Sequence, residues 1–394
     1  MLRFVYFFIK LRRPQGDKVL LVSGLSGEPI IDISMLAGEL SAKYPGIEAK
    51  VISERMGRSM SGVFAFIPGM LLQMREIAGA KVVVLDRSNI AANALRHREG
   101  TKIVQIWHAP DAIKKFGYQV TDMKGGLDGR VAEVMCVHKN YDYILCPSKA
   151  VEKAYCEAFG AGPEKMLPGR RYGMPRIDRI TEISRKGDEL RHELRESILR
   201  EHPDMAEGRI ALYAPTFRDV RATKTEELVN ELLERGFAPA LKLHPLEEGG
   251  MDDSHSAMDW FAVADFVITD YSSLAVEAAA AGLPLYFYVY DIEEYTEERG
   301  LNYDLRDEAI SPYVFTDAGE LAEALDSDGY DYDRLKDFRY KHLECPPTGN
   351  TEALAGFIAS LVSGEDPDES QDEAASSRPD SQTRADKTQQ GVPS

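Results

Sequence analysis

The chain contains 394 residues, which is long enough for two domains and a tail. It is 44% apolar and 28% charged, as is usual for a soluble globular protein. The net charge of −18 argues against a nucleic-acid-binding protein, because phosphate backbones repel an acidic surface. The four cysteines have no CxxC or zinc-ligand spacing, so we expect free thiols in a reducing compartment and no metal site.

No run of about 18 apolar residues occurs, so the sequence predicts no helix that crosses a bilayer. Residues 2–13, LRFVYFFIKLRR, form a short, aromatic and basic segment without a signal-peptide cleavage site. Two interpretations stay open for this segment. It could lie in a membrane interface with its cations on anionic headgroups, or it could be a first strand or helix that packs on the fold.

In the first half of the chain, short apolar runs rich in β-branched residues alternate with segments of helical spacing. The expected strands are 18–23, 48–53, 81–86, 102–107 and 141–146. The expected helices are 31–43, 64–78, 90–96 and 150–159. This alternation predicts an α/β fold, with a parallel sheet covered by helices on both faces.

The pattern restarts after a highly charged helical segment, residues 182–201, where a domain boundary is expected. The second set of strands is 209–213, 239–243, 266–269 and 285–290, and its helices are 225–235, 274–281 and 318–325. A last helix, 352–361, has the option of packing back on the first domain. We therefore predict domains at 1–190 and 205–363, and a disordered acidic tail at 364–394.

The stretch 263–291, VADFVITDYSSLAVEAAAAGLPLYFYVYD, reads as strand, turn, helix and strand. Its turn places Ser272 and Ser273 at the start of a helix, directly after a strand. Hydroxyls and free backbone N–H groups at such a place bind anions, and ligands of open α/β sheets bind at this edge. The alternative is that one of these serines only caps the helix.

Other polar residues also follow directly after expected strands: His108, Thr216, Arg218 and His244. Histidines, an arginine fork, hydroxyls and helix N-termini suit phosphate chemistry. The chain lacks a carboxylate cluster suited to Mg²⁺, a GxGxxG fingerprint and a P-loop. The sequence thus predicts a phosphate site without a metal, in a cleft between two sheets.

Five motifs carry a resemblance to a known family. They are IVQIWHAPDAIKKFGYQ, GMPRIDRI, ALYAPTFRD, LKLHP and DFVITDYSSLAVEAAAAGLPLYFYVYDIEEYTEERGLNYD, within residues 104–304. In this order they resemble the CDP-glycerol glycerophosphotransferases of teichoic acid synthesis. The resemblance implies a GT-B-like fold of two Rossmann-type domains, whose parallel sheets face a central cleft.

The resemblance also implies an activity and partners. Such enzymes transfer glycerol phosphate or ribitol phosphate from a CDP-activated donor to a hydroxyl of a lipid-linked saccharide, and CMP leaves. They are peripheral on the cytoplasmic face of the cell membrane. We therefore expect CDP-glycerol or CDP-ribitol as donor substrate, no further cofactor and no nucleic acid, and the oligomeric state stays open, a homo-oligomer included.

Residue roles follow from the same resemblance. His108 matches the histidine expected to act as general base toward the acceptor hydroxyl. His244 matches a histidine expected on the donor phosphates, and we count both histidines as catalytic. Thr216 and Arg218 match expected contacts to the diphosphate.

Asp270, Ser272 and Ser273 match the DYSS motif, which the resemblance puts at the pyrophosphate. Glu277 stands where many relatives have Asp, near the expected ribose. Arg176 and Asp178 match a motif expected to shape the interdomain side of the cleft, with Arg176 among the substrate-binding residues.

Some features depart from the family or stay open. Asp111 adds a carboxylate near His108, which either orients His108 or is a solvated loop charge; the latter is slightly favoured. The region before residue 104 matches weakly, and the length is closer to priming enzymes than to polymerases. The rival interpretations are a GT-B sugar-nucleotide glycosyltransferase or epimerase, and a non-catalytic scaffold of a polymer-synthesis complex.

Overall fold

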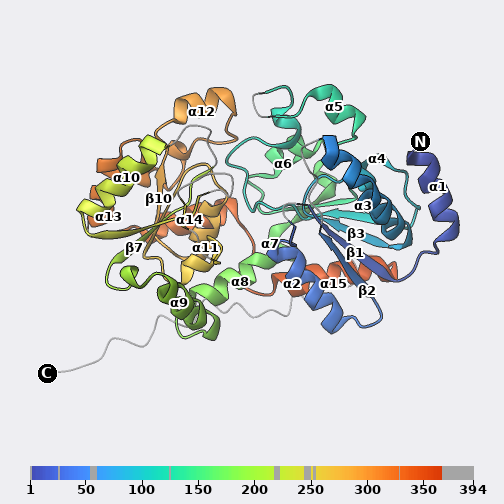
Figure 1. The fold of residues 1–394 in the computed structure, drawn as a ribbon, viewed down its shortest axis with the longest axis horizontal. Helices are drawn as coiled ribbons and strands as arrows, with labels where there is room; N and C mark the ends of the chain where they lie inside the picture. Colours follow the sequence, from blue (N-terminus) through green and yellow to red (C-terminus); the bar gives the residue numbers. More distant parts are fainter. Residues whose placement is uncertain are drawn as a thin grey trace.

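A computed structural model of the chain describes residues 2–24, 27–53, 60–123, 126–216, 222–243, 250–251, 254–327 and 329–365. Two parallel sheets stand side by side, each flanked by helices (Figure 1). The first sheet has six strands in the order β2-β1-β3-β4-β5-β6, and the second has five in the order β11-β10-β9-β7-β8. The predicted α/β fold with two parallel sheets is confirmed.

The strands of the first sheet are β1 (Lys18–Ser23), β2 (Glu48–Ser53), β3 (Val82–Leu85), β4 (Lys102–Gln105), β5 (Tyr143–Cys146) and β6 (Met166–Pro168). Those of the second are β7 (Arg209–Tyr213), β8 (Phe237–Leu241), β9 (Phe266–Thr269), β10 (Leu285–Tyr288) and β11 (Val314–Phe315). The central strands β1 and β3 are continuous aliphatic runs that are buried along their whole length. Parallel strands covered on both faces by helices require this pattern.

The helices of the first half are α1 (Leu2–Arg12), α2 (Ile31–Lys43), α3 (Met60–Gly79), α4 (Ile90–Ala94), α5 (Gly129–Val134), α6 (Glu152–Phe159), α7 (Gly169–Tyr172) and α8 (Pro175–Ser184). Those of the second half are α9 (Glu189–Glu201), α10 (Ala222–Glu234), α11 (Leu274–Ala281), α12 (Ile292–Glu298), α13 (Ala318–Asp326), α14 (Tyr332–His342) and α15 (Asn350–Ser363). The 3₁₀ turns that matter below are η1 (Gly117–Val120) and η5 (Leu305–Asp307).

The single helix predicted for residues 182–201 is wrong, because two helices occupy this region. Gly187 adopts a positive φ of 88°, and the side chain of Asp188 accepts a hydrogen bond from the backbone N–H of Leu190. The helix α8 ends at Ser184 with Arg185 in an extended conformation, Gly187 turns the chain, and the Asp188 cap starts α9. The sequence analysis also missed β6, β11, α5, α7, α12 and α14, which are short or largely charged.

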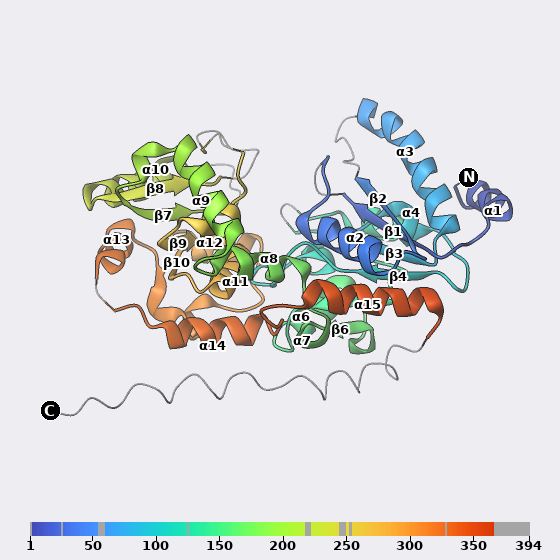
Figure 2. The ribbon, with the colours of Figure 1, turned by 90° about the horizontal axis from the view of Figure 1, so that it is seen from below.

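The last helix, α15, packs on the first sheet rather than on the second. It runs beside α2 under β1 and β3, while α14 lies under the second half (Figure 2). The ring of Phe357 in α15 contacts Tyr143 and Tyr172, with centroids 5.1 and 4.8 Å apart. The chain thus crosses between its two halves a second time, as one of the sequence-based options allowed. The domain limits 1–190 and 205–363 stay a prediction, and residues 366–394 lie outside the described part.

The N-terminal segment forms α1, which packs along α3. Tyr6 is buried, and its hydroxyl lies 2.9 Å from Nδ1 of His97. The opposite side of α1 is exposed, with Phe4 69% and Leu11 67% accessible. Among the described helices, none has the length and apolar character needed to cross a membrane.

Candidate active site

The ends of β7 and β9 are tied together by Asp270. This carboxylate is buried directly after β9, and its Oδ1 accepts hydrogen bonds from the backbone N–H and the hydroxyl of Thr216, at 2.8 and 2.7 Å. One layer deeper, the hydroxyl of Thr269 donates to the carbonyl of Ala214 at 2.7 Å. Asp270 therefore holds Thr216 at the carboxyl edge of the second sheet.

The two serines of the turn lie half-buried at the start of α11. The hydroxyl of Ser272 accepts from the backbone N–H of Leu274 at 3.3 Å, a long capping bond. Ser273 occupies the N-cap position, with φ −63° and ψ −10°, and its side chain makes no capping hydrogen bond. Helix capping thus explains the hydroxyl of Ser272 in part, but it does not explain the hydroxyl of Ser273.

Arg176 is the buried centre of the site. Its Nε and Nη2 donate to Oδ2 of Asp32, at 2.8 and 2.5 Å, and its own backbone N–H donates to Oδ1 of the same residue. On its other side Nη1 donates to Oε1 of Glu277 at 2.7 Å. All three residues are less than a tenth exposed. Arg176 thus joins the first turn of α2, in the first half, to the first turn of α11, in the second.

The charges in this cluster depend on one another. Burial alone would lower the pKa of Arg176, but Asp32 and Glu277 raise it above its usual value. Burial raises the pKa of Glu277, and the Arg176 charge opposes that rise. Glu277, expected near the ribose, therefore sits in an ion pair, and Arg176 is engaged on both sides by carboxylates.

Asp178 lies within the same helical turn and holds another element. Its carboxylate accepts from the backbone N–H groups of Asn350 and Thr351 and from both of their side chains, at 2.6 to 3.0 Å. A carboxylate at a helix N-terminus is stabilised by the helix dipole. The GMPRID motif thus fixes α2, α11 and α15 from one turn of α8.

His108 follows β4 and is placed by a strained residue. Trp107 adopts a positive φ of 58°, which is uncommon outside glycine, and its backbone N–H donates to the side chain of Gln105 at 2.9 Å. The indole stacks on Phe116 and contacts Phe159, which fixes this conformation. The chain therefore turns sharply at Trp107 and sets His108 at the carboxyl edge of the first sheet.

The protonation state of His108 follows from its contacts. Burial lowers its pKa, the carbonyl of Asp86 opposes this, and the charges of Arg87, Arg176 and Lys114 add to the lowering, so that the pKa is about 4. Nδ1 lies 3.0 Å from that carbonyl oxygen, which can only accept, so Nδ1 carries the proton. Nε2 is then the unprotonated nitrogen, and it has no hydrogen-bond partner among the residues that the structure describes. Because Arg176 acts on both His108 and Glu277, the two halves converge here.

Asp111 is not a solvated loop charge, and it does not contact His108. It is 4% exposed, accepts a hydrogen bond from the hydroxyl of Tyr303, and faces His342. The sequence analysis missed this partnership, as it missed Asp32 and Glu308. Tyr303 lies within the GLNYD end of a quoted motif, which was the available signal.

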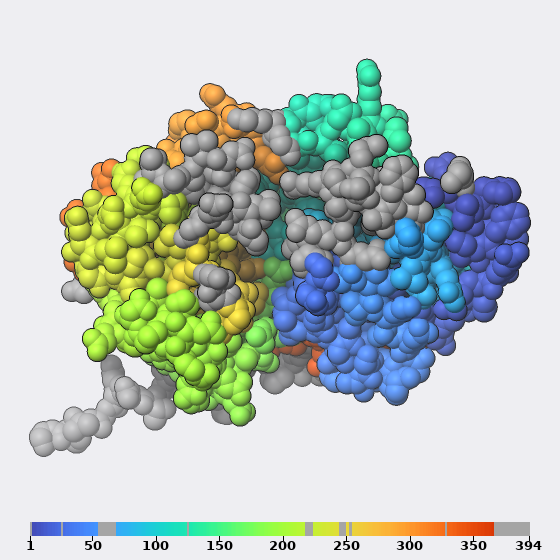
Figure 3. All heavy atoms as spheres, in the orientation of Figure 1, coloured from blue at the N-terminus to red at the C-terminus, as the bar shows by residue number. Residues whose placement is uncertain are grey.

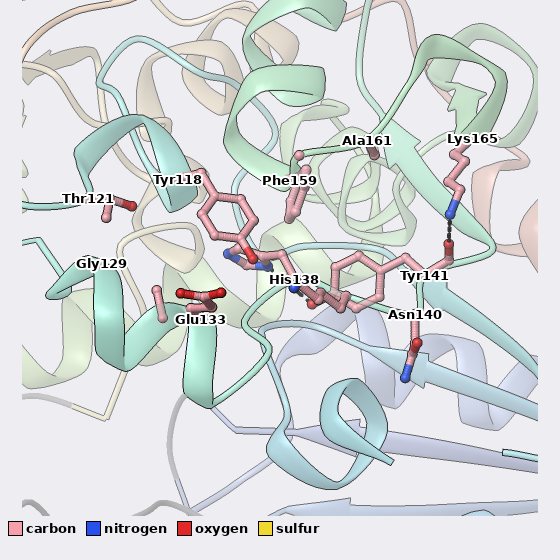
Figure 4. Close-up of a pocket in the computed structure, with 13 residues that line it drawn as sticks. Tyr118, Thr121, Gly129, Glu133, His138, Asn140, Tyr141, Phe159, Ala161 and Lys165 are labelled. Atoms are coloured by element: carbon pink, nitrogen blue, oxygen red, sulfur yellow. Dashed lines mark hydrogen bonds between the residues drawn. The ribbon is translucent and has the colours of Figure 1, made fainter. Parts of the chain in front are cut away.

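Two candidate residues, Arg218 and His244, lie outside the described residues, so their expected contacts stay predictions. A cavity of about 580 Å³, which the sequence analysis did not predict, lies between η1, α5 and the end of α6 (Figure 4). Its lining includes Tyr118, His138 and Phe159, and the ring of His138 is 5.8 Å from that of Trp107.

Two parallel-sheet halves with polar groups converging from their strand ends form a GT-B-like fold with a candidate site between them. The family model described as CDP-glycerol:poly(glycerophosphate) glycerophosphotransferase matches residues 7–359, so the chain belongs to this family. The family and the fold inferred from the sequence are thereby confirmed, and the chain is a transferase of this family.

Relatives and a solved structure agree with this assignment. The chain is 28% identical to the teichoic acid ribitol-phosphate primase of Bacillus spizizenii, over 89% of this chain and 93% of the relative. It is 24% identical to the teichoic acid glycerol-phosphate primase of Bacillus subtilis, over 91% and 96%. The structure of the wall teichoic acid polymerase TagF superposes with a TM-score of 0.65 at 19% identity, covering 91% of this chain and 92% of that one.

The Arg176 cluster yields a stability prediction. We expect Arg176→Met to lower the free energy of unfolding by about 3–5 kcal/mol, because Asp32 and Glu277 lose their counter-charge while buried. The matched Arg306→Met change removes an arginine from two exposed ion pairs and should cost at most about 1 kcal/mol. Urea unfolding followed by circular dichroism measures both, and equal losses would contradict the assignment.

Proposed function

We propose that this enzyme transfers a polyol phosphate from CDP-glycerol or CDP-ribitol to a hydroxyl of a lipid-linked saccharide, with release of CMP. The observation that carries the proposal is the state of His108. A neutral imidazole, whose Nδ1–H is fixed on the carbonyl of Asp86, presents Nε2 as a proton acceptor. The family match and the two primases support the donor class.

The reaction is an in-line displacement at the β-phosphorus of the donor. Nε2 of His108 takes the acceptor proton as the acceptor oxygen forms its bond to phosphorus, and the bond from that phosphorus to the CMP oxygen breaks. Burial lowers the pKa of His108 before the donor binds, and nearby arginine and lysine charges add to that effect. The negative diphosphate opposes those charges, so donor binding raises the basicity of His108.

The donor diphosphate binds at the carboxyl edge of the second sheet. The serine pair at the N-terminus of α11 supplies donors there, next to Thr216, whose own N–H and hydroxyl both donate to Asp270. Arg218 and His244 join them on the strength of the motif resemblance. Glu277 keeps its predicted place near the ribose, and its bond to Arg176 sets the orientation of α11.

The enzyme works on a membrane-borne acceptor, and we assign α1 to the membrane surface on the cytoplasmic side. Phe4, Phe8 and Leu11 recur on one exposed face of α1, with Lys10 between them and arginines at both ends of the stretch. In the space-filling view the N-terminal segment forms one outer edge of the molecule (Figure 3). Apolar rings with flanking cations are typical of a helix in a headgroup layer.

The first test is release of CMP from CDP-glycerol and from CDP-ribitol, with and without a lipid-linked disaccharide. We expect one of the two donors to release CMP only when the lipid-linked disaccharide is present, because the proposed displacement needs the acceptor hydroxyl. Absence of CMP with both donors, together with turnover of UDP-sugars, would replace the proposal with the sugar-nucleotide alternative.

A second prediction concerns His108. His108→Ala should lower turnover at least 100-fold, since general-base catalysis contributes about 10²–10⁴-fold, while the affinity for the CDP-polyol stays within about twofold. The exposed His192→Ala change on α9 is the control and should leave both unchanged. With a pKa of about 4, His108 is neutral from pH 6 to 8, so kcat/KM should show no acid limb from this group in that range. Wild-type turnover of His108→Ala would remove it from the mechanism.

A third prediction concerns α1. The triple variant Phe4→Ser, Phe8→Ser and Leu11→Ser should lose co-sedimentation with phosphatidylglycerol vesicles, because it removes the exposed apolar stripe. Leu233→Ser with Tyr340→Ser removes exposed apolar side chains from α10 and α14 and should bind like wild type. Unchanged sedimentation of the triple variant would rule out α1 as the docking element.

A further inference from the structure

The segment that follows His108 is fastened to the second half of the chain. The backbone N–H of Asn302 donates to the carbonyl of Ile113 at 2.8 Å, and its side chain donates to the carbonyl of Ala112 at 2.9 Å. Nearby, Lys115 N–H donates to the carbonyl of Gly300 at 3.0 Å. Residues 112–115 and 300–302 therefore form a short antiparallel contact between the two halves.

A buried charge cluster lies beside this contact. The imidazole of His342, at the end of α14, is 1% exposed and stands between two carboxylates. Its Nδ1 lies 3.6 Å from Oδ1 of Asp111, and its Nε2 lies 3.1 Å from Oε2 of Glu308. The ring of Tyr303 stacks on the imidazole, with centroids 4.2 Å apart, and its hydroxyl donates to Asp111.

The charges of the cluster are balanced. Lys341 reaches both oxygens of Glu308, at 2.8 and 2.7 Å, so two cations face two carboxylates once His342 is protonated. Burial alone would lower the pKa of His342, but Asp111 and Glu308 raise it to about 9. The imidazolium is therefore the stable form at neutral pH.

The members of the cluster come from different parts of the fold. Asp111 belongs to the loop that begins at His108, whereas Tyr303, Glu308 and His342 belong to the second half. On the other side of the same loop, the hydroxyl of Tyr155 in α6 donates to the carbonyl of Ala109 at 2.9 Å. The backbone on both sides of residue 110 is thus held. Besides the backbone contact with residues 300–302, the loop has an ionic anchor at Asp111 that also spans both halves.

We propose that His342 is a positioning residue: its imidazolium binds Asp111 and thereby fixes the His108 loop relative to the donor edge of the other half. This inference rests on the proposed phosphotransferase function for its kinetic consequences. Its structural consequence, a loop fixed by a titratable contact, does not depend on the reaction.

The sign of the pH effect follows from the groups around His342. Asp111, Glu308 and the Tyr303 hydroxyl face it, and Lys341 and the ring of Phe338 lie on its own helix. Because the folded-state pKa is raised from 6.5, the contact is complete below pH 6.5 and is lost as the pH rises through about 9. Neutral His342 leaves Asp111 without its counter-charge, and the loop loosens.

The experiment compares His342→Gln with the exposed control His192→Gln. We expect His342→Gln to lower kcat about tenfold or more, since small misplacements of a base are costly, while CDP affinity changes less than twofold. The wild-type enzyme should lose kcat above about pH 9, and the variant should lack this alkaline limb. The proposal would be overturned if His342→Gln had the kcat of the wild-type enzyme, or if its pH profile of kcat kept the same alkaline limb.

Hydrogen–deuterium exchange separates this proposal from the proposed function. In the wild-type chain, the amides of Lys115 and Asn302, which donate across the contact, should lose protection between pH 7 and pH 10 after correction for intrinsic rates, while those of β1 keep it. Asp111→Asn should expose the same amides already at pH 7. Uniform protection in both experiments would overturn the inference even for an active enzyme, and the predicted loss would support it even if neither CDP-polyol is a substrate.

Discussion

The arrangement of the two halves depends on the buried guanidinium of Arg176. It pairs with Asp32 at the start of α2 and with Glu277 at the start of α11, and each of these helices begins where a strand ends. Two carboxylates removed from water are tolerated only while the cation lies between them. The same turn of α8 also caps α15 through Asp178. One short motif thus fixes the two strand edges toward each other and returns the C-terminal helix to the first sheet.

The chemistry at these edges is electrostatic. His108 stays neutral because its half-buried ring is desolvated and lies near arginine and lysine charges, and the carbonyl of Asp86 selects the tautomer that leaves Nε2 open. On the facing edge, Asp270 orients Thr216, and Ser273 has a hydroxyl that does not cap its own helix. A general base on one half and anion donors on the other suit transfer of a phosphoryl group between two separately bound substrates.

Two buried ionic clusters join the halves of the chain next to the candidate active site. The Arg176 cluster fixes α11, and the Asp111–His342–Glu308 cluster fixes the loop after His108. Buried ionic contacts need specific geometry, and they are costly when one partner is missing. They therefore select one relative placement of base and donor edge, which apolar packing of the sheets alone would leave less defined.

The sequence by itself determined most of the strands, the parallel α/β architecture and the family. Apolar runs such as 19–22, alternating with helical segments, indicate buried parallel strands, and polar residues directly after such strands share one edge of a sheet. It could not assign partners to Arg176, Glu277 or Asp111. Asp32 is 144 positions from Arg176 and His342 is 231 from Asp111 (176 − 32 and 342 − 111), so only tertiary packing brings them within ion-pair distance. Tertiary burial also decided the neutral state of His108 and the charged state of His342, because a pKa shift depends on desolvation and neighbours that local sequence does not encode.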